Sequence, residues 1–265
     1  MENVICGFIE LNGEVVKISS VEDLKDLAAR LGSAFTELSV KDFEKLCDKL
    51  NGEYKKDDCG VFYSKDGKRI LLAPITSDEY LIKAGTIAIS SYAFNWHSYQ
   101  SGGTLYTNRY AHEKKIDKIY IPDSVIAIGS EAFCDNTVIE KIIVSSNLEY
   151  IGDKAFSGCW RMCNFTIPTS LKYIESEAFD RCCNAFTELV LPKSMKNIGS
   201  HAFRGCSRLE KVMFSSEIEN IGSGIFDGCE KLAKIVVPKG SYKIFCEQLP
   251  FFADIITEND NDINL

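Results

Sequence analysis

The sequence predicts a repeat solenoid built from parallel strands, and two patterns indicate this fold class. A short phrase that ends in Ala-Phe or Ile-Phe recurs along the 265 residues, with its aromatic residues 39, 23, 23, 24 and 23 positions apart. These residues are Phe94, Phe133, Phe156, Phe179, Phe203 and Phe226. Each unit also carries three apolar residues in the spacing Leu-x-x-Leu-x-Leu. A unit this short cannot bury its apolar face alone, so its neighbours must stack on it.

Each apolar triplet predicts one short strand. Its last two members point to the same side of the strand, while the residue between them points to the opposite side. The triplets are Ile116-Ile119-Ile121, Ile139-Ile142-Val144, Met162-Phe165-Ile167, Phe186-Leu189-Leu191, Leu209-Val212-Phe214 and Leu232-Ile235-Val237. This triplet and a period of 23 residues are typical of leucine-rich repeats. We therefore expect a right-handed leucine-rich-repeat solenoid with parallel strands and about six coils.

A glycine follows the isoleucine of a second apolar phrase in most units. These glycines are Gly129, Gly152, Gly199 and Gly222. Glycine suits either a backbone position with positive φ or a close approach between coils, and both explanations stay open here. Glu175 takes the same place in one unit, so glycine is not required in every coil.

Three residues after the recurrent phenylalanine stands an Asn or a Cys, and these residues form a column along the predicted stack. The column is Asn136, Cys159, Cys182, Cys206 and Cys229. Their side chains are expected to hydrogen-bond turn backbone that would otherwise be buried without a partner. A zinc site is the alternative, but thiolates one coil apart, at about 4.8 Å, are too far apart to share one zinc with bonds of about 2.3 Å. We predict a structural column, and no metal or other cofactor.

The phrase Ile-Pro-x-Ser-Val-x-x-Ile-Gly-x-x-Ala-Phe-x-x-Cys resembles the BspA-like leucine-rich repeats. Residues 121–133 and 191–206 match it well, and the resemblance covers about residues 60–256. The segment 60–68 resembles the hairpin that often opens such arrays, and 237–242 resembles the closing phrase of their last coil. Because members of this family are often surface adhesins or binding proteins, the resemblance implies recognition rather than catalysis.

Residues 1–58 lack the repeat and predict a small α+β unit. Asn12-Gly13 between two apolar runs, 4–11 and 14–18, is a strong signal for a β-hairpin. Ser20 and Ser39 each precede a segment with apolar residues at helical spacing, which predicts two helices. A solenoid needs a cap at its open end. The unit is therefore interpreted as a cap, with a separate interaction domain as the alternative.

The solenoid is expected to span residues 59–257, with a C-terminal cap at 238–257. Tyr242, Phe245, Cys246 and Leu249 predict a short amphipathic helix that ends before Pro250. Residues 258–265 are polar and are expected to form a disordered tail.

The first interval of 39 residues exceeds the period and predicts an insertion near residues 95–115. Its candidate ligand-binding residues are Trp96, Tyr99, Tyr106 and Tyr110. On a rigid scaffold such a loop is a candidate recognition element, since Trp and Tyr give large contact areas at low entropic cost. The alternative is that these rings pack back on the coil beneath them.

The outward positions of the predicted strands form the main candidate ligand-binding face. Six parallel strands about 4.8 Å apart would make a sheet about 24 Å across, which one extended peptide or helix could cover. The candidate residues are Lys118, Tyr120, Lys141, Ile143, Thr166, Val190, Lys211, Met213, Lys234 and Val236. Exposed apolar residues in such a column often mark an interaction site. β-branched residues also favour strands without any ligand, so intrinsic propensity stays an alternative.

Composition restricts the partners. The formal net charge of −8, with no local run of Lys or Arg, argues against nucleic acid and anionic membrane surfaces. No apolar stretch is long enough to span a membrane, and the N-terminus lacks the pattern of a signal peptide. The chain as written is expected to be cytoplasmic, or at the cell surface or secreted if a leader is missing. The 11 cysteines include no Cys-x-x-Cys pair and are odd in number, so reduced thiols are expected.

Nothing in the sequence indicates catalysis. His201 aligns with charged residues of neighbouring units, and His97 and His112 are the only other histidines. The sequence has no Gly-Lys-Ser phosphate loop, no His-Glu-x-x-His and no Gly-x-Ser-x-Gly. We predict a non-catalytic scaffold that binds a protein or peptide through its strands. The alternatives are a surface adhesin or structural module that binds a host protein or glycan, a homodimer that covers the same face, and, as the weakest, an enzyme with an unrecognised Cys/His site.

Overall fold

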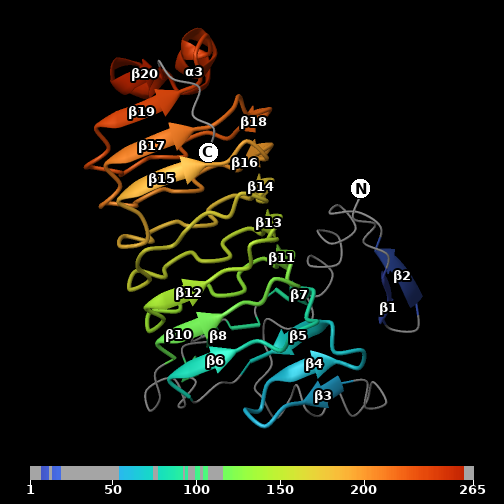
Figure 1. Cartoon of the computed structure of the whole chain (residues 1–265). Helices are drawn as coiled ribbons and strands as arrows, with labels where there is room; N and C mark the ends of the chain where they lie inside the picture. Colours follow the sequence, from blue (N-terminus) through green and yellow to red (C-terminus); the bar gives the residue numbers. More distant parts are fainter. Residues whose placement is uncertain are drawn as a thin grey trace.

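The computed structural model describes residues 7–11, 14–18, 54–73, 77–91, 93–94, 99–101, 104–106 and 116–259. The described part of the chain from residue 54 onward winds into a parallel β-solenoid of about seven turns (Figure 1). The predicted fold class is confirmed. The predicted N-terminal hairpin is also confirmed, because β1 (Gly7–Leu11) pairs antiparallel with β2 (Glu14–Ile18).

Short strands lie along one side of the solenoid, where they form two sheets. All of them except the strands at residues 79–81 and 256–258 come from the predicted apolar triplets. The first sheet consists of β6 (Glu79–Leu81), β10 (Lys118–Tyr120) and β12 (Lys141–Ile143). The second consists of β15 (Glu188–Leu191), β17 (Lys211–Phe214), β19 (Lys234–Val237) and β20 (Ile256–Glu258). All strand pairs in both sheets are parallel.

The second apolar phrase of each coil forms a further sheet, which the sequence analysis does not predict. Its parallel strands are β7 (Ala88–Ile89), β11 (Ala127–Ile128), β13 (Tyr150–Ile151), β14 (Tyr173–Ile174), β16 (Asn197–Ile198) and β18 (Asn220–Ile221). Its other strands are β5 (Arg69–Leu72), β4 (Phe62–Ser64) and β3 (Tyr54–Lys56). The antiparallel pair of β4 and β5 is the opening hairpin that the family resemblance implies. β3 joins this sheet although it lies before residue 58.

One predicted strand is wrong. Residues 162–167 form no strand, because Asn164 has a φ of 53° and breaks the extended backbone there. The following coil is also one residue longer, and the Phe165 amide donates to the carbonyl oxygen of Ala185 at 3.0 Å. The single six-stranded sheet expected from the sequence is therefore two sheets, and Thr166 lies between them.

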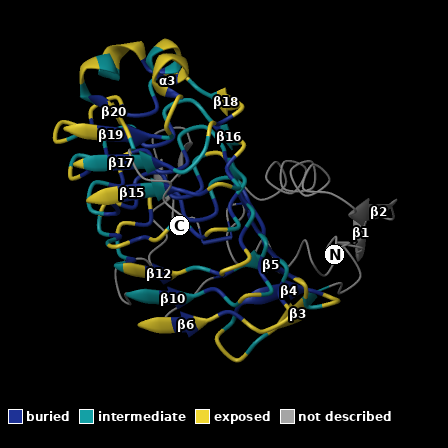
Figure 2. Cartoon of the chain, turned by 45° about the horizontal axis from the view of Figure 1, so that its top comes forward, coloured by how far each residue is buried: buried dark blue, intermediate teal, exposed yellow. Residues whose placement is uncertain are grey.

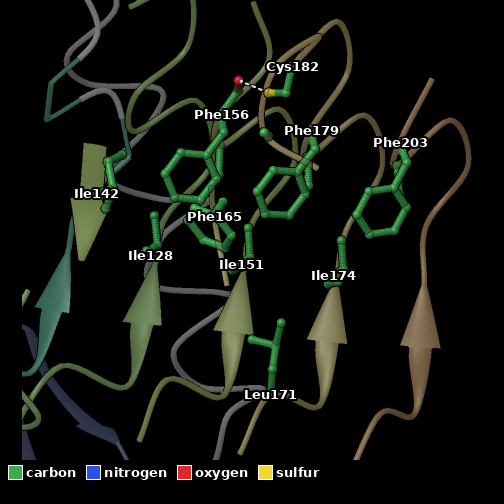
Figure 3. Packing of buried hydrophobic residues seen from close by; sticks show 14 of the residues in the cluster. Ile128, Ile142, Ile151, Phe156, Phe165, Leu171, Ile174, Phe179, Cys182 and Phe203 are labelled. Carbon is green, nitrogen blue, oxygen red and sulfur yellow. Dashed lines mark hydrogen bonds between the residues drawn. The ribbon is translucent and has the colours of Figure 1, made fainter. Parts of the chain in front are cut away.

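The recurrent phenylalanines form one stack through the solenoid, part of which Figure 3 shows. Successive ring centroids lie 4.6 to 5.9 Å apart, with interplanar angles of 2° to 25°. All of these rings are at most 1% exposed. Phe165 meets the stack edge-on, with its centroid 5.0 Å from that of Phe179. Each coil thus fills its core against the next coil.

The glycine that recurs after the second strand of most coils allows the coils to pack closely. A Cβ atom on Gly199 would lie 2.3 Å from the amide nitrogen of Ser176, and one on Gly129 would lie 2.5 Å from that of Ser91. Of the two explanations from the sequence, the close approach is therefore the correct one. Positive φ occurs instead two residues before and two residues after each phenylalanine from Phe133 onward.

The two ends of the solenoid are closed differently. At the N-terminal end the buried Tyr80 of β6 donates a hydrogen bond to Asp57 at 2.7 Å, and its hydroxyl lies 2.5 Å from that of Tyr63. At the C-terminal end the last coil is followed by the helix α3 (Tyr242–Gln248) and the 3-10 helix η2 (Pro250–Ile255). The predicted helix and its end before Pro250 are confirmed.

The last ring of the stack and the last strand complete the C-terminal end. Phe252 of η2 lies edge-on to Phe226, with centroids 5.9 Å apart. β20 includes Glu258, whose carboxylate accepts hydrogen bonds from the amides of Gly240 and Tyr242 at 2.9 and 3.0 Å. The sequence predicts that the polar tail begins at residue 258, but residue 258 still belongs to the last strand.

Several sequence predictions lie outside the described residues. They are the two helices of the N-terminal unit, Trp96 and Tyr110 of the insertion, and the tail from residue 260. Tyr99 and Tyr106 lie in β8 (Tyr99–Ser101) and β9 (Thr104–Tyr106), which pair antiparallel, but only the backbone is described there. The role of the insertion stays a prediction.

Replacing Phe156 by alanine tests the stack. The ring is 0% exposed and is covered by neighbours on both faces, so Phe156→Ala should lower the free energy of unfolding by about 3 to 5 kcal/mol. Chemical denaturation followed by circular dichroism measures this change. Trp160→Ala is the matched control, because Trp160 is 50% exposed and its loss should cost less than about 1 kcal/mol. Equal melting temperatures for Phe156→Ala and the wild type would contradict the stack.

Candidate functional site

The strand register brings the predicted outward residues into rows along the solenoid. Within each of the two parallel sheets, residues at the same place in successive coils lie opposite one another. One row, which we call the apolar column, consists of Leu81, Tyr120, Ile143, Val190, Met213 and Val236. The surface that carries it, formed by β6, β10, β12, β15, β17 and β19, is called the strand face.

Most of the strand face is accessible to solvent, as Figure 2 shows for its strands. Leu81 is 68% exposed and Ile143 is 36% exposed. Tyr120, Val190 and Met213 are half-buried. These apolar side chains have no layer of structure over them among the described residues, so water or a partner must cover them.

Two predicted residues of this face differ from expectation. Val236 is only 8% exposed and lies between Met213 and Thr257 on the neighbouring strands. It is buried, although the sequence places it on the accessible face. Thr166 is exposed but belongs to no strand, because the chain leaves the extended conformation at Asn164.

A second row of the strand face is charged and runs beside the apolar column. We call it the charged column, and it consists of Glu79, Lys118, Lys141, Glu188, Lys211 and Lys234. Lys118 Nζ lies 2.6 Å from Glu79 Oε1, and Lys211 Nζ lies 3.4 Å from Glu188 Oε2. The hydrogen bond and charge of Lys118 lower the pKa of Glu79, and Glu79 raises the pKa of Lys118 for the same reasons. Exposed pairs contribute little to stability, but they decide which lysines keep a free charge.

Sequence reasoning missed the first strand of this face. β6 contributes Leu81, the most exposed residue of the apolar column, and Glu79. Its coil is separated from the next one by the long insertion, so it does not show the period of 23 residues. The alternation of Tyr80 and Ile82, both buried, with Leu81 is the signal that could have indicated a strand there.

The Asn and Cys column lies inside the solenoid, at the corner after each phenylalanine. Each side chain donates a hydrogen bond to the carbonyl oxygen of the phenylalanine one coil earlier. The donor–acceptor distances are 3.4 Å for Asn136 to Phe94, 3.0 Å for Cys159 to Phe133, 2.9 Å for Cys182 to Phe156, 3.4 Å for Cys206 to Phe179 and 3.2 Å for Cys229 to Phe203. Figure 3 shows the bond of Cys182.

The thiols of this column are held in their neutral form. Burial raises the pKa of Cys229 to about 12, and burial also raises the pKa of Cys159, Cys182 and Cys206 above the ordinary value. A neutral thiol is a hydrogen-bond donor and a weak nucleophile. The hydrogen bonds to the phenylalanine carbonyls support the structural role that the sequence predicts for these cysteines.

A carboxylate and two arginines join adjacent coils at another corner. Asp180 is fully buried, and Arg204 Nε and Nη2 each donate to one of its oxygens at 2.8 Å. Arg181 Nε lies 3.1 Å from the same carboxylate. Burial alone would raise the pKa of Asp180, but the hydrogen bonds and charges of the two arginines outweigh it, and the pKa lies below its ordinary value.

In the part of the chain that the structure describes, no group of three or more His, Cys, Asp and Glu side chains could hold a metal ion. None of the helices in that same part of the chain has the length and apolar character needed to cross a bilayer. His201 Nε2 lies 3.8 Å from Asp227 Oδ2 at a solvent-accessible corner.

Comparison with known proteins places the repeat in a family. The family model described as "BspA type Leucine rich repeat region (6 copies)" matches residues 103–233 and 181–249, which together cover more than half of the chain. No curated protein matches the chain.

Solved structures with the same architecture are bacterial leucine-rich-repeat proteins. One from T. pallidum is 23% identical with a TM-score of 0.54, over 69% of this chain and 77% of that one. A leucine-rich cell surface protein from Faecalibacterium prausnitzii is 18% identical with a TM-score of 0.51, over 69% of this chain and 54% of that one. One from Bacteroides ovatus is 23% identical with a TM-score of 0.48, over 70% of this chain and 47% of that one. At these identities the likeness to the T. pallidum and Faecalibacterium prausnitzii proteins shows the fold alone.

Removing one thiol of the column tests its structural role. Cys182→Ala removes one of the two donors to the buried carbonyl of Phe156, which keeps its hydrogen bond from the amide of Cys159. The free energy of unfolding should therefore fall by about 0.5 to 1.5 kcal/mol. Denaturant titration in the presence of a reductant measures the loss. Cys59→Ala is the control, because Cys59 is exposed and its removal should leave stability unchanged. If both variants unfold at the same denaturant concentration as the wild type, the column does not stabilise the fold.

The lowered pKa of Asp180 should make the free energy of unfolding depend on pH. Its pKa is lower in the folded chain, so the unfolded chain binds more protons and the contribution of Asp180 is complete above the unfolded pKa of about 4. This contribution is lost as the pH falls through the folded pKa. Asp180→Asn should therefore destabilise the protein most above about pH 5, and the difference from the wild type should shrink toward about pH 2. Thermal melts across this range measure it, and a difference that does not change with pH would contradict the assignment.

Proposed function

Because the chain belongs to the BspA type leucine-rich-repeat family, we propose that it is a non-catalytic scaffold that recognises a protein or peptide through its strand face. Leucine-rich-repeat families are commonly scaffolds for protein interactions. The fold supports this use, since its two sheets of parallel strands offer a surface on which one extended segment or helix can lie.

The observation that carries the proposal is the exposure of the apolar column. Leu81 and Ile143 are 68% and 36% exposed. They lie opposite Tyr120 on the two strands that neighbour β10. Contiguous apolar surface of this kind is uncommon on a protein that works alone. A partner that covered it would gain free energy from the water that both surfaces release.

Strand propensity alone does not account for the composition of this column. Propensity explains Ile143 and Val190, because β-branched residues favour strands in any context. Leu81 and Met213 are not β-branched, and Leu81 is the most exposed large apolar residue on the strand face. Their presence in the same row supports selection for contact with a partner.

Two glutamate substitutions on the strand face test the proposal. Ile143→Glu combined with Val190→Glu puts charge into the apolar column without touching the phenylalanine stack, so the chain should fold and partner binding should be lost. Affinity capture from the native organism's lysate and surface fractions, quantified by mass spectrometry, measures the loss. Circular dichroism first establishes that the variant is folded.

A second double variant is the matched control. Ile244→Glu with Phe251→Glu changes two apolar side chains that are 40% and 95% exposed on the C-terminal helices, away from the strand face. It should capture the partner like the wild type. Equal capture by the strand-face variant would overturn the proposal and direct attention to the insertion or the N-terminal unit. Sedimentation of the wild type and the strand-face variant shows whether the partner is a second copy of the chain.

A further inference from the structure

The charges of the strand face follow the same order in both sheets. Across the strands, each sheet presents a glutamate, then a lysine that pairs with it, then a second lysine. These triads are Glu79, Lys118 and Lys141 in the first sheet and Glu188, Lys211 and Lys234 in the second.

The second lysine of each triad keeps an uncompensated charge. Neither Lys141 nor Lys234 forms an ion pair with any residue that the structure describes, and both are exposed. By the repeat spacing, the residue after Lys141 in this column is the uncharged Asn164. Glu140, next to Lys141 in the chain, pairs with Arg161 instead. Within the described part of the chain, two lysines without an ion-pair partner therefore lie beside the apolar column, on a chain whose formal net charge is −8.

We propose that the strand face binds an extended, acidic segment of a partner protein that runs along the solenoid axis. One carboxylate of the segment pairs with Lys141, a second pairs with Lys234, and apolar side chains between them pack on the apolar column. The inference rests on the proposed function and specifies the chemistry of the partner.

The spacing of the two lysines sets the length of the segment. Asn164, Glu188 and Lys211 stand between them in successive coils, and coils about 5 Å apart put Lys141 and Lys234 about 20 Å apart. An extended chain covers this distance in about six residues at about 3.3 Å each. Because six is even, side chains at positions i, i+2, i+4 and i+6 all point toward the strand face.

The surface between the lysines favours apolar side chains. Val190 and Met213 are half-buried there, and Thr166 is exposed and uncharged. Lys211 is compensated by Glu188, whose carboxylate would repel a third acidic residue. The expected recognition sequence is therefore acidic-x-apolar-x-apolar-x-acidic, and a uniformly acidic segment should bind less well.

Peptide selection tests this pattern directly. A displayed library of random peptides about nine residues long is selected on the immobilised full-length chain, and the enriched sequences are determined. They should carry Asp or Glu at two positions six apart, with apolar residues two and four positions after the first. An enrichment without this acidic pair, or no enrichment above the background of the library, would overturn the inference.

Charge reversal then assigns the contacts. For the enriched peptides, Lys141→Glu with Lys234→Glu should raise the dissociation constant by about tenfold or more, measured by fluorescence anisotropy. Peptides with lysine in place of both acidic residues should bind this variant better than they bind the wild type. Lys196→Glu with Lys243→Glu is the control with the same change in net charge at exposed sites off the strand face, and it should change affinity by less than about twofold at physiological salt.

The outcomes separate this inference from the proposed function. If Ile143→Glu with Val190→Glu abolishes binding while the charge reversal has no effect, the strand face recognises peptides and the acidic pattern is wrong. If binding survives both variants, the peptides bind elsewhere, and both the inference and the proposed face are overturned. Loss of binding in both variants, with rescue by the lysine peptides, supports both.

Discussion

A single coil of this protein has no interior of its own, so its apolar side chains are buried only when another coil lies on them. The phenylalanine stack expresses this constraint most clearly, because each inner ring is covered on both faces by its neighbours. The glycine after the second strand lets the backbones approach. The Asn and Cys column adds a donor from the next coil to the carbonyl of every recurrent phenylalanine from Phe94 to Phe203. Where no coil follows, Phe252 covers the last ring instead.

The features that depend on this stacking repeat with fixed spacing, and they are the ones that can be predicted from the sequence. The inward triplets, the phenylalanines and the column with Cys182 all follow from the period. The strand break at Asn164 does not, because a left-handed backbone and one extra residue in the next coil leave the apolar spacing almost unchanged. The strands from β7 to β18 of the nine-stranded sheet are two residues long, too short for an alternating pattern to reveal.

The sequence predicts which residues form the rows of the candidate site, but it does not predict how far each side chain is exposed. Nothing in the spacing separates Val236 from Val190, yet neighbours on both sides bury Val236. Charge compensation also depends on register between coils that are far apart in the chain. Lys118 pairs with Glu79 across the insertion, and only the three-dimensional arrangement shows that Lys141 is the lysine left with a free charge.

The interruption at Asn164 affects only one side of the solenoid. On the other side β13 and β14 pair without a break across the same coil. Backbone hydrogen bonds resist separation of strands. At this coil the interrupted side keeps isolated bonds, such as those of the Cys163 and Phe165 amides, but no continuous ladder, so it yields first under stress. The solenoid should therefore bend at this coil about the nine-stranded sheet that contains β13 and β14, and the curvature of the opposite surface should vary there. A ligand long enough to contact both sheets of the strand face would restrict this bending, so that the parts of the solenoid before and after Asn164 would move together.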